Sequence, residues 1–107
     1  MDSSEYVRHV LEAYRAVPGT CGAVRRPDRA LALQLFARGV PLAAVENAFV
    51  LACARRLARP ADAAPLGVIR SLAYFSPVID EVLNLRVDDA YFRHLRQRLA
   101  RFLQKPS

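Results

Sequence analysis

Apolar residues recur at three- and four-residue spacing along most of this chain, and the strict alternation typical of β-strands is missing. This periodicity predicts a first helix that begins near Ser3 or Ser4, either of which can cap it, and that ends at about Ala16. Its apolar stripe consists of Tyr6, Val7, Val10, Leu11 and Tyr14.

Two further helices are predicted between residues 27 and 59. Pro27 suits the first turn of the second helix, Asp28 complements its dipole, and Gly39 is a good residue for its left-handed end. The buried residues expected there are Leu31, Leu35 and Phe36. Pro41 opens the third helix, whose apolar face consists of Leu42, Val45, Phe49, Ala52 and Cys53.

The segment RSLAYFSPVIDEV, residues 70–82, follows a short linker at Pro60–Pro65. Its helical spacing predicts a fourth helix that starts near Pro65 or Leu66 and ends at about Leu83. Pro77 stands in the middle, where proline removes a backbone hydrogen bond, so we expect either a kinked core helix or two helices that meet at Ser76.

A turn and a capping residue, Asp88, should precede a last helix that runs to about Gln104. The prediction is therefore an all-α fold, a compact bundle of about five helices that forms a single domain over residues 1–107. The composition agrees, because alanine and leucine are strong helix formers and together they supply 32 residues.

The net charge of +6 comes from fifteen arginines and a single lysine. Arginine binds phosphate well through its planar fork, but a GC-rich genome would also favour arginine over lysine. No apolar run reaches the roughly 20 residues that span a membrane. The polar start MDSSEY is no targeting sequence, so we expect a cytoplasmic protein in which Cys21 and Cys53 are free thiols.

The basic residues gather in two groups. The first lies on the last helix, away from its expected apolar stripe of Phe92, Leu95, Leu99, Phe102 and Leu103, and consists of Arg93, Arg96, Arg98, Arg101 and Lys105. The second consists of Arg55, Arg56, Arg59 and Arg70. Both groups can neutralise nucleic-acid phosphates without reading sequence. A solvated helix face and a complement to the helix dipole explain the same residues.

Other chemistry is poorly represented in the sequence. The Gly39–Pro41 connection has the spacing of a helix-turn-helix, but among the exposed early residues only Asn47 could read a base, and a plain αα-hairpin fits equally. His9 and His94 have no partners at metal-ligand spacing. No phosphate loop or catalytic couple is present, so we expect neither an enzyme nor a bound metal or cofactor.

One motif resembles a known family. The order Ser71, Leu72, Ala73, Tyr74, Phe75, then Val78, Ile79 and Val82, is similar to the closing motif of the DnaD-type replication domain, and the likeness extends over roughly residues 5–83. Related helical modules occur in replication initiators of phages and plasmids. The resemblance implies weak DNA binding without strong sequence preference, beside other replication proteins, with Tyr74 and Ile79 holding the motif.

The resulting hypothesis is an accessory domain of DNA replication or of a mobile element that binds single- or double-stranded DNA through an arginine-rich face, with no role at a membrane. Tyr74 could stack on a base, but we expect it in the core with its hydroxyl at the surface. The alternative is a protein-interaction or self-association module. Its surface would be a groove beside Pro77 or a face made of Tyr6, Tyr14 and Phe49.

Overall fold

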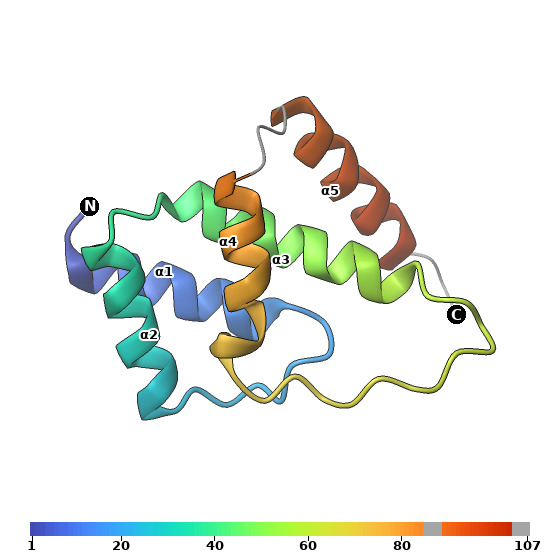
Figure 1. Ribbon diagram of the computed structural model, residues 1–107, viewed down its shortest axis with the longest axis horizontal. Helices are drawn as coiled ribbons and strands as arrows, with labels where there is room; N and C mark the ends of the chain where they lie inside the picture. Colours follow the sequence, from blue (N-terminus) through green and yellow to red (C-terminus); the bar gives the residue numbers. More distant parts are fainter. Residues whose placement is uncertain (85–88, 104–107) are drawn as a thin grey trace.

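The computed structural model describes residues 1–84 and 89–103, and over these residues the prediction of an all-α bundle is confirmed (Figure 1). The elements are α1 (Ser3–Ala16), α2 (Arg26–Ala37), α3 (Leu42–Leu57), the 3₁₀ turn η1 (Leu72–Phe75), α4 (Ser76–Asn84) and α5 (Asp89–Leu103). The turn was expected over residues 84–87, but Asn84 is the last residue of α4. The rest of that turn, the cap at Asp88 and the helix end at Gln104 lie outside the described residues.

Helix α1 has the predicted bounds and the predicted buried stripe, but a different cap. The N-cap is Asp2, whose carboxylate accepts the backbone N–H of Glu5 at 2.8 Å. The expected caps Ser3 and Ser4 are instead the first two helical residues. The carboxylate of Asp2 satisfies one of the otherwise unpaired N–H groups and also complements the positive end of the helix.

Helices α2 and α3 form the expected hairpin. Gly39 has φ +74°, a backbone conformation that favours glycine, and the backbone N–H of Val40 bonds the carbonyl of Leu35 at 3.0 Å. Leu35 is buried as predicted, but the prediction for Phe36 is wrong, since 37% of it is exposed. Its ring lies at the edge of the bundle, in T-shaped contact with Tyr6 at 5.3 Å.

Asp28 does more than complement the dipole of α2. It is the one charged residue among those described that is buried, at 2% exposure. Its carboxylate accepts the backbone N–H of Arg25 at 2.9 Å and that of Leu72 at 2.9 Å. A buried carboxylate needs such partners, and here they join the start of α2 to the start of η1.

The predicted start of the fourth helix is wrong. After α3 the chain is irregular as far as residue 71, and it pairs with the loop after α1 through a parallel bridge between Thr20 and Ile69. Ile69 donates to the carbonyl of Gly19 at 2.8 Å, and Cys21 donates to the carbonyl of Ile69 at 2.9 Å. The burial of Ile69, at 2% exposure, favours this extended segment over a longer helix.

Pro77 stands in the first turn of α4, where its missing N–H costs no helical hydrogen bond. The chain passes from η1 into α4 at Ser76, which agrees with the second of the two alternatives, two helical pieces that meet at that residue, and not with a single kinked helix. Within the segment Leu72, Phe75 and Ile79 are buried. Tyr74 is not, since 44% of it is exposed, and its predicted place in the core is wrong.

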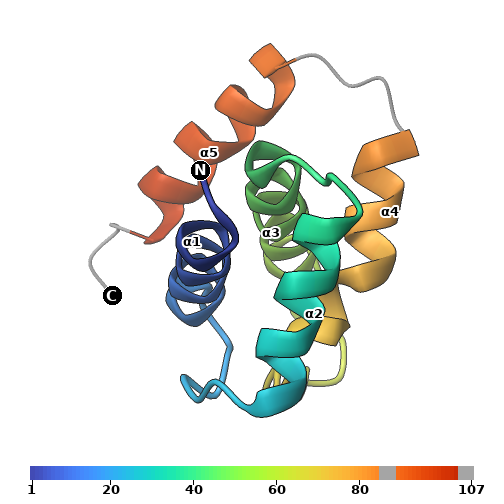
Figure 2. The same cartoon turned by 90° about the vertical axis from the view of Figure 1, so that its left-hand side faces the viewer.

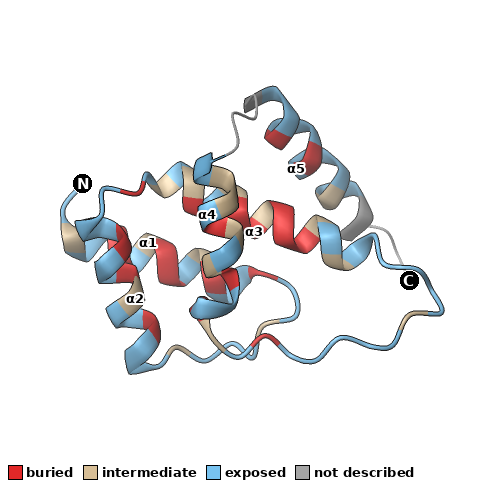
Figure 3. Cartoon of the chain, in the orientation of Figure 1, coloured by how far each residue is buried: buried red, intermediate tan, exposed pale blue. Residues whose placement is uncertain are grey.

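The main core lies among α1, α2, α3, η1 and α4, and Figure 3 shows where the buried positions fall along these elements. Phe75 is at its centre, in T-shaped contact with Tyr14 at 6.1 Å and with Phe49 at 4.8 Å. Tyr6, Tyr14 and Phe49 are all at most 4% exposed. The self-association face predicted from these three residues is therefore wrong, because they form the interior.

A second, smaller core lies beneath α5. It consists of Leu51 from α3 and of Phe92 and Leu95 from α5. Helix α5 packs on α3, and Figure 2 shows it on the side of α3 away from α2. The bundle thus has a large core shared by most elements and a narrow one that holds its last helix.

Candidate nucleic-acid interface

Helix α5 is held by one narrow apolar stripe. Phe92 and Leu95, three residues apart, are 3% and 7% exposed, and Leu99 one turn further on is half-buried. Three- and four-residue spacing places these side chains on one face of the helix, and the remaining positions turn away from α3. The arginines of α5 occupy those remaining positions because burying an unpaired guanidinium would be costly.

The four predicted arginines of α5 are all exposed. Arg96 donates to the amide oxygen Oδ1 of Asn47 on α3. The side chains of Arg93, Arg98 and Arg101 have no hydrogen bond or ion pair within the part of the chain that the structure describes. Because the Asn47 amide is neutral, all four positive charges remain uncompensated by these contacts. Lys105, predicted as part of the same group, lies outside the described residues.

Asn47 was the one candidate for base reading on the hypothetical recognition helix. In the structure α3 is the central helix, packed against α1, α4, α5 and η1 (Figure 1). A recognition helix must instead enter the major groove with a free face. The contact between Asn47 and Arg96 also engages the amide that would read the base. The structure therefore favours the plain αα-hairpin.

Arg55, which belongs to the second predicted group, contacts a residue of α4. Its guanidinium forms a bidentate contact with the carboxylate of Glu81, in which the hydrogen bond from Nη1 to Oε2 is 2.7 Å long. This hydrogen-bonded contact holds the pKa of Glu81 below its ordinary value and raises the pKa of Arg55. Both side chains are at the surface, at 50% and 36% exposure, so solvent screens the attraction.

Arg56 forms hydrogen bonds that hold the irregular segment after α3 in place. It donates to the hydroxyl of Tyr74 at 3.2 Å and to the carbonyl of Gly67 at 3.1 Å, and its guanidinium carbon lies 5.8 Å from the centre of the Tyr74 ring. Arg59 donates similarly to the carbonyl of Ala64 at 2.7 Å. These two arginines therefore have structural roles that the sequence pattern did not indicate.

The second predicted group does not form one cluster. Arg56 and Arg59 line a hollow with the loop after α1, including Pro18 and Gly19. Arg70 is exposed and follows the buried Ile69 in the extended segment. Only Arg55 comes next to α5, where it lines the same cleft as Arg98. Of the nine predicted binding residues, the α5 arginines thus remain together, while Arg56, Arg59 and Arg70 lie elsewhere.

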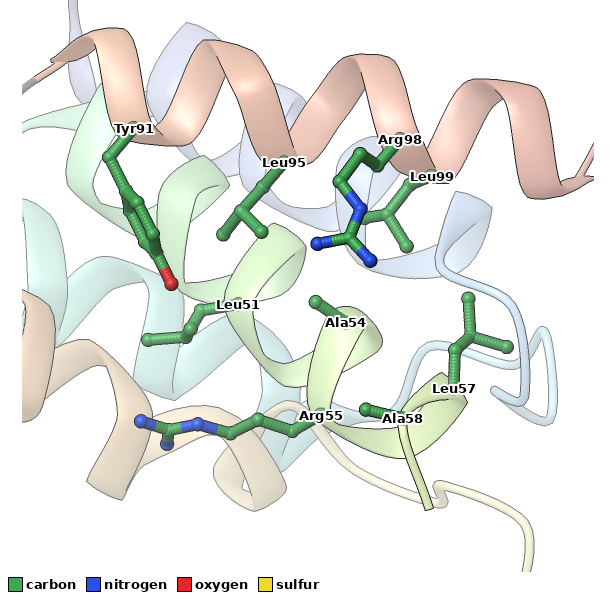
Figure 4. Close-up of a pocket in the computed structure, with 9 residues that line it drawn as sticks. All are labelled: Leu51, Ala54, Arg55, Leu57, Ala58, Tyr91, Leu95, Arg98 and Leu99. Carbon is green, nitrogen blue, oxygen red and sulfur yellow. The ribbon is translucent and has the colours of Figure 1, made fainter. Parts of the chain in front are cut away.

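A cleft of about 390 Å³ opens between α3 and α5 beside the second core (Figure 4). Leu51 and Ala54 of α3 and Leu95 of α5 form its apolar surface. Tyr91 precedes Leu95 on α5 and Arg98 follows it, and both side chains extend toward α3. Tyr91 is not among the predicted site residues, although its position four residues before Leu95 places it beside the stripe.

A second basic site was also missed. A groove of about 460 Å³ between α1 and α2 is lined by Arg8, Arg15 and Arg29 together with the acidic Glu12. The side chains of these arginines are exposed and have no hydrogen bond or ion pair among residues 1–84 and 89–103. Arg8 and Arg15 are two turns apart on α1, a signal the sequence contains, whereas the approach of Arg29 depends on how α2 packs.

Other reactive side chains are dispersed. Cys21 is exposed, Cys53 is buried, and both are free; burial raises the pKa of the Cys53 thiol. In the described portion of the chain no three or more His, Cys, Asp and Glu residues are grouped so that they could hold a metal ion.

Comparison with family models, with curated proteins and with solved structures finds no match to this chain. Within the described residues, none of the helices has the length and apolar character needed to cross a membrane.

Proposed function

We propose that this domain binds nucleic acid without sequence preference, through contacts between the arginines of α5 and the phosphate backbone. The observation that carries the proposal is the presence of three exposed arginines on α5, Arg93, Arg98 and Arg101, without partners among the described residues. Neutralising phosphates with such cations releases condensed counterions, which drives binding and makes it depend on salt. Contacts with phosphates position the protein on the nucleic acid and do not read its sequence.

The proposed biological setting is an accessory role in DNA replication or in a mobile element, in the cytoplasm and alongside other replication proteins. It rests on the resemblance of residues 71–82 to the closing motif of the DnaD-type domain. In this proposal the protein has a binding role and no catalytic one.

The test is the salt dependence of binding to a labelled 20-base-pair DNA duplex, followed by fluorescence anisotropy. With four phosphate contacts, the affinity should fall roughly 100-fold between 50 and 200 mM salt. The triple variant Arg93→Gln, Arg98→Gln and Arg101→Gln should reduce the slope of log affinity against log salt by about 2.7, since each lost contact removes about 0.9.

The matched control is the triple variant Arg8→Gln, Arg15→Gln and Arg29→Gln, which removes the same charge from the groove between α1 and α2. It should retain most of the salt slope. Equal losses in both triple variants would show that overall charge, and not α5, determines binding. If the unmodified protein bound no DNA at 50 mM salt, the proposal would be wrong.

Failure of DNA binding would favour the alternative of a protein-interaction or self-association module. An exposed pair on α2 supports this alternative, because 50% of Leu33 and 37% of Phe36 are accessible. These side chains are three residues apart, so they lie on one side of the helix.

A further inference from the structure

Tyr91 lies on the cleft between α3 and α5 with 47% of its surface exposed. The neighbouring Phe92 is buried in the second core and meets the Tyr91 ring at 76°, with 5.6 Å between the ring centres. Phe92 thus anchors the helix turn that presents Tyr91, while the tyrosine ring itself forms one end of the cleft (Figure 4).

Arg98 forms the opposite end of the same cleft. It follows Tyr91 by seven residues, which is two turns or about 10 Å along the helix. Leu95 stands between them, and Figure 4 shows the guanidinium of Arg98 directed toward Ala54 on α3. An apolar surface is thus bordered by an aromatic ring at one end and a planar cation at the other.

Tyr74 is the natural comparison, because it is exposed to nearly the same extent, at 44%. The guanidinium carbon of Arg56 lies 5.8 Å from its ring centre, and its hydroxyl accepts a hydrogen bond from the same arginine. Binding a base on Tyr74 would compete with these contacts. Tyr91, with a cleft beside it, has room for an additional ring.

We infer that the cleft between α3 and α5 receives one unstacked base of a single-stranded nucleic acid, an inference that rests on the proposed function. The base stacks on Tyr91 over the apolar surface of Leu95 and Ala54, and Arg98 contacts its face or the adjoining phosphate. The volume of about 390 Å³ falls in the range of small-molecule sites and exceeds what a single base needs.

The cleft favours single strands over duplexes for a simple physical reason. Bases inside a duplex are covered on both faces by their neighbours, and a base must be unstacked before it can enter a pocket. In a single strand this cost is low. Arg93 and Arg101, exposed on the same helix, remain free to contact phosphates in either form.

The experiment compares the binding of oligo(dT) 15-mers with that of a 15-base-pair duplex at 50 mM salt. Tyr91→Ala should weaken oligo(dT) binding about ten-fold, within the range measured for loss of one stacking contact, and leave duplex binding within about two-fold. Ala54→Leu, which fills the cleft from α3, should have the same selective effect. Tyr74→Ala is the control with similar exposure and should not distinguish the two forms.

Circular dichroism of each variant establishes that α5 remains folded. Equal weakening of oligo(dT) and duplex binding by Tyr91→Ala, or no effect on either, would overturn the inference while the proposed function stands. Failure of the unmodified protein to bind both nucleic acids would instead overturn the proposed function, and with it the inference.

Discussion

The main core and the small core beneath α5 differ in how the surrounding charges are used. On α2 and α3, three arginines bond to the chain itself: Arg38 follows α2 and contacts Asp80 at 3.5 Å, Arg55 contacts Glu81, and Arg56 bonds Tyr74 and Gly67. On α5, three exposed arginines lack such partners among the described residues. Arginine thus stabilises loops and helix contacts at Arg38, Arg55 and Arg56, whereas Arg93, Arg98 and Arg101 of α5 present positive charge to solvent.

The largest expected effect distinguishes the two cores. Phe75→Ala removes a completely buried ring at the centre of the main core, so the free energy of unfolding should fall by about 3–5 kcal/mol. Phe92→Ala should mainly release α5, because that helix packs on α3 through its narrow stripe. Urea unfolding measures the first effect, and amide hydrogen exchange should show faster exchange in α5 with α1–α4 still protected.

An equal fall in the urea midpoint for both phenylalanine variants would contradict this distinction. It would show that α5 belongs to the same cooperative unit as the main core.

A smaller effect should separate the two kinds of arginine. Arg56→Gln loses two hydrogen bonds and the contact with the Tyr74 ring, so stability should fall by about 1 kcal/mol with DNA affinity nearly unchanged. Arg101→Gln should instead weaken DNA binding and leave the melting temperature unchanged. Thermal unfolding and anisotropy on the same samples provide both measurements. A loss of DNA affinity in Arg56→Gln equal to that in Arg101→Gln would remove the contrast.

The smallest expected effect concerns pH and the contact between Arg55 and Glu81. Because the pKa of Glu81 is lowered in the folded protein, its stabilisation is complete above the ordinary glutamate pKa of about 4.3 and is lost as the pH falls through the lower folded value. Arg55→Gln should therefore lower the melting temperature slightly at pH 7, and the difference from the unmodified protein should shrink toward pH 3.

Solvent screening keeps this difference small, and 0.5 M salt should reduce it further. A difference in melting temperature that grew on acidification would contradict the assigned contact.

Most helix positions were predictable from local signals. The bounds of α1, the hairpin at Gly39 and the break at Ser76 all follow from residues within a few positions of each other. The start of the fourth helix was not predictable in this way. Ile69 is held extended by Thr20 and its neighbours, 49 residues earlier, and such a distant pairing leaves no periodic signal near Ile69.

The same distinction between local signals and distant contacts applies to the candidate site. The sequence alone was enough to establish an α-helical chain, the apolar positions Phe92, Leu95 and Leu99 of α5 and an excess of arginine, because periodicity and charge are local properties; the side chains of Phe102 and Leu103, predicted in the same stripe, lie outside the described part. Only the packed structure separates Arg56, bonded to Tyr74, from Arg98, which borders an open cleft, and shows that Tyr91 lies beside that cleft. The physical reason is that the partners of a side chain depend on which elements pack together, and neither residue type nor helical spacing specifies that packing.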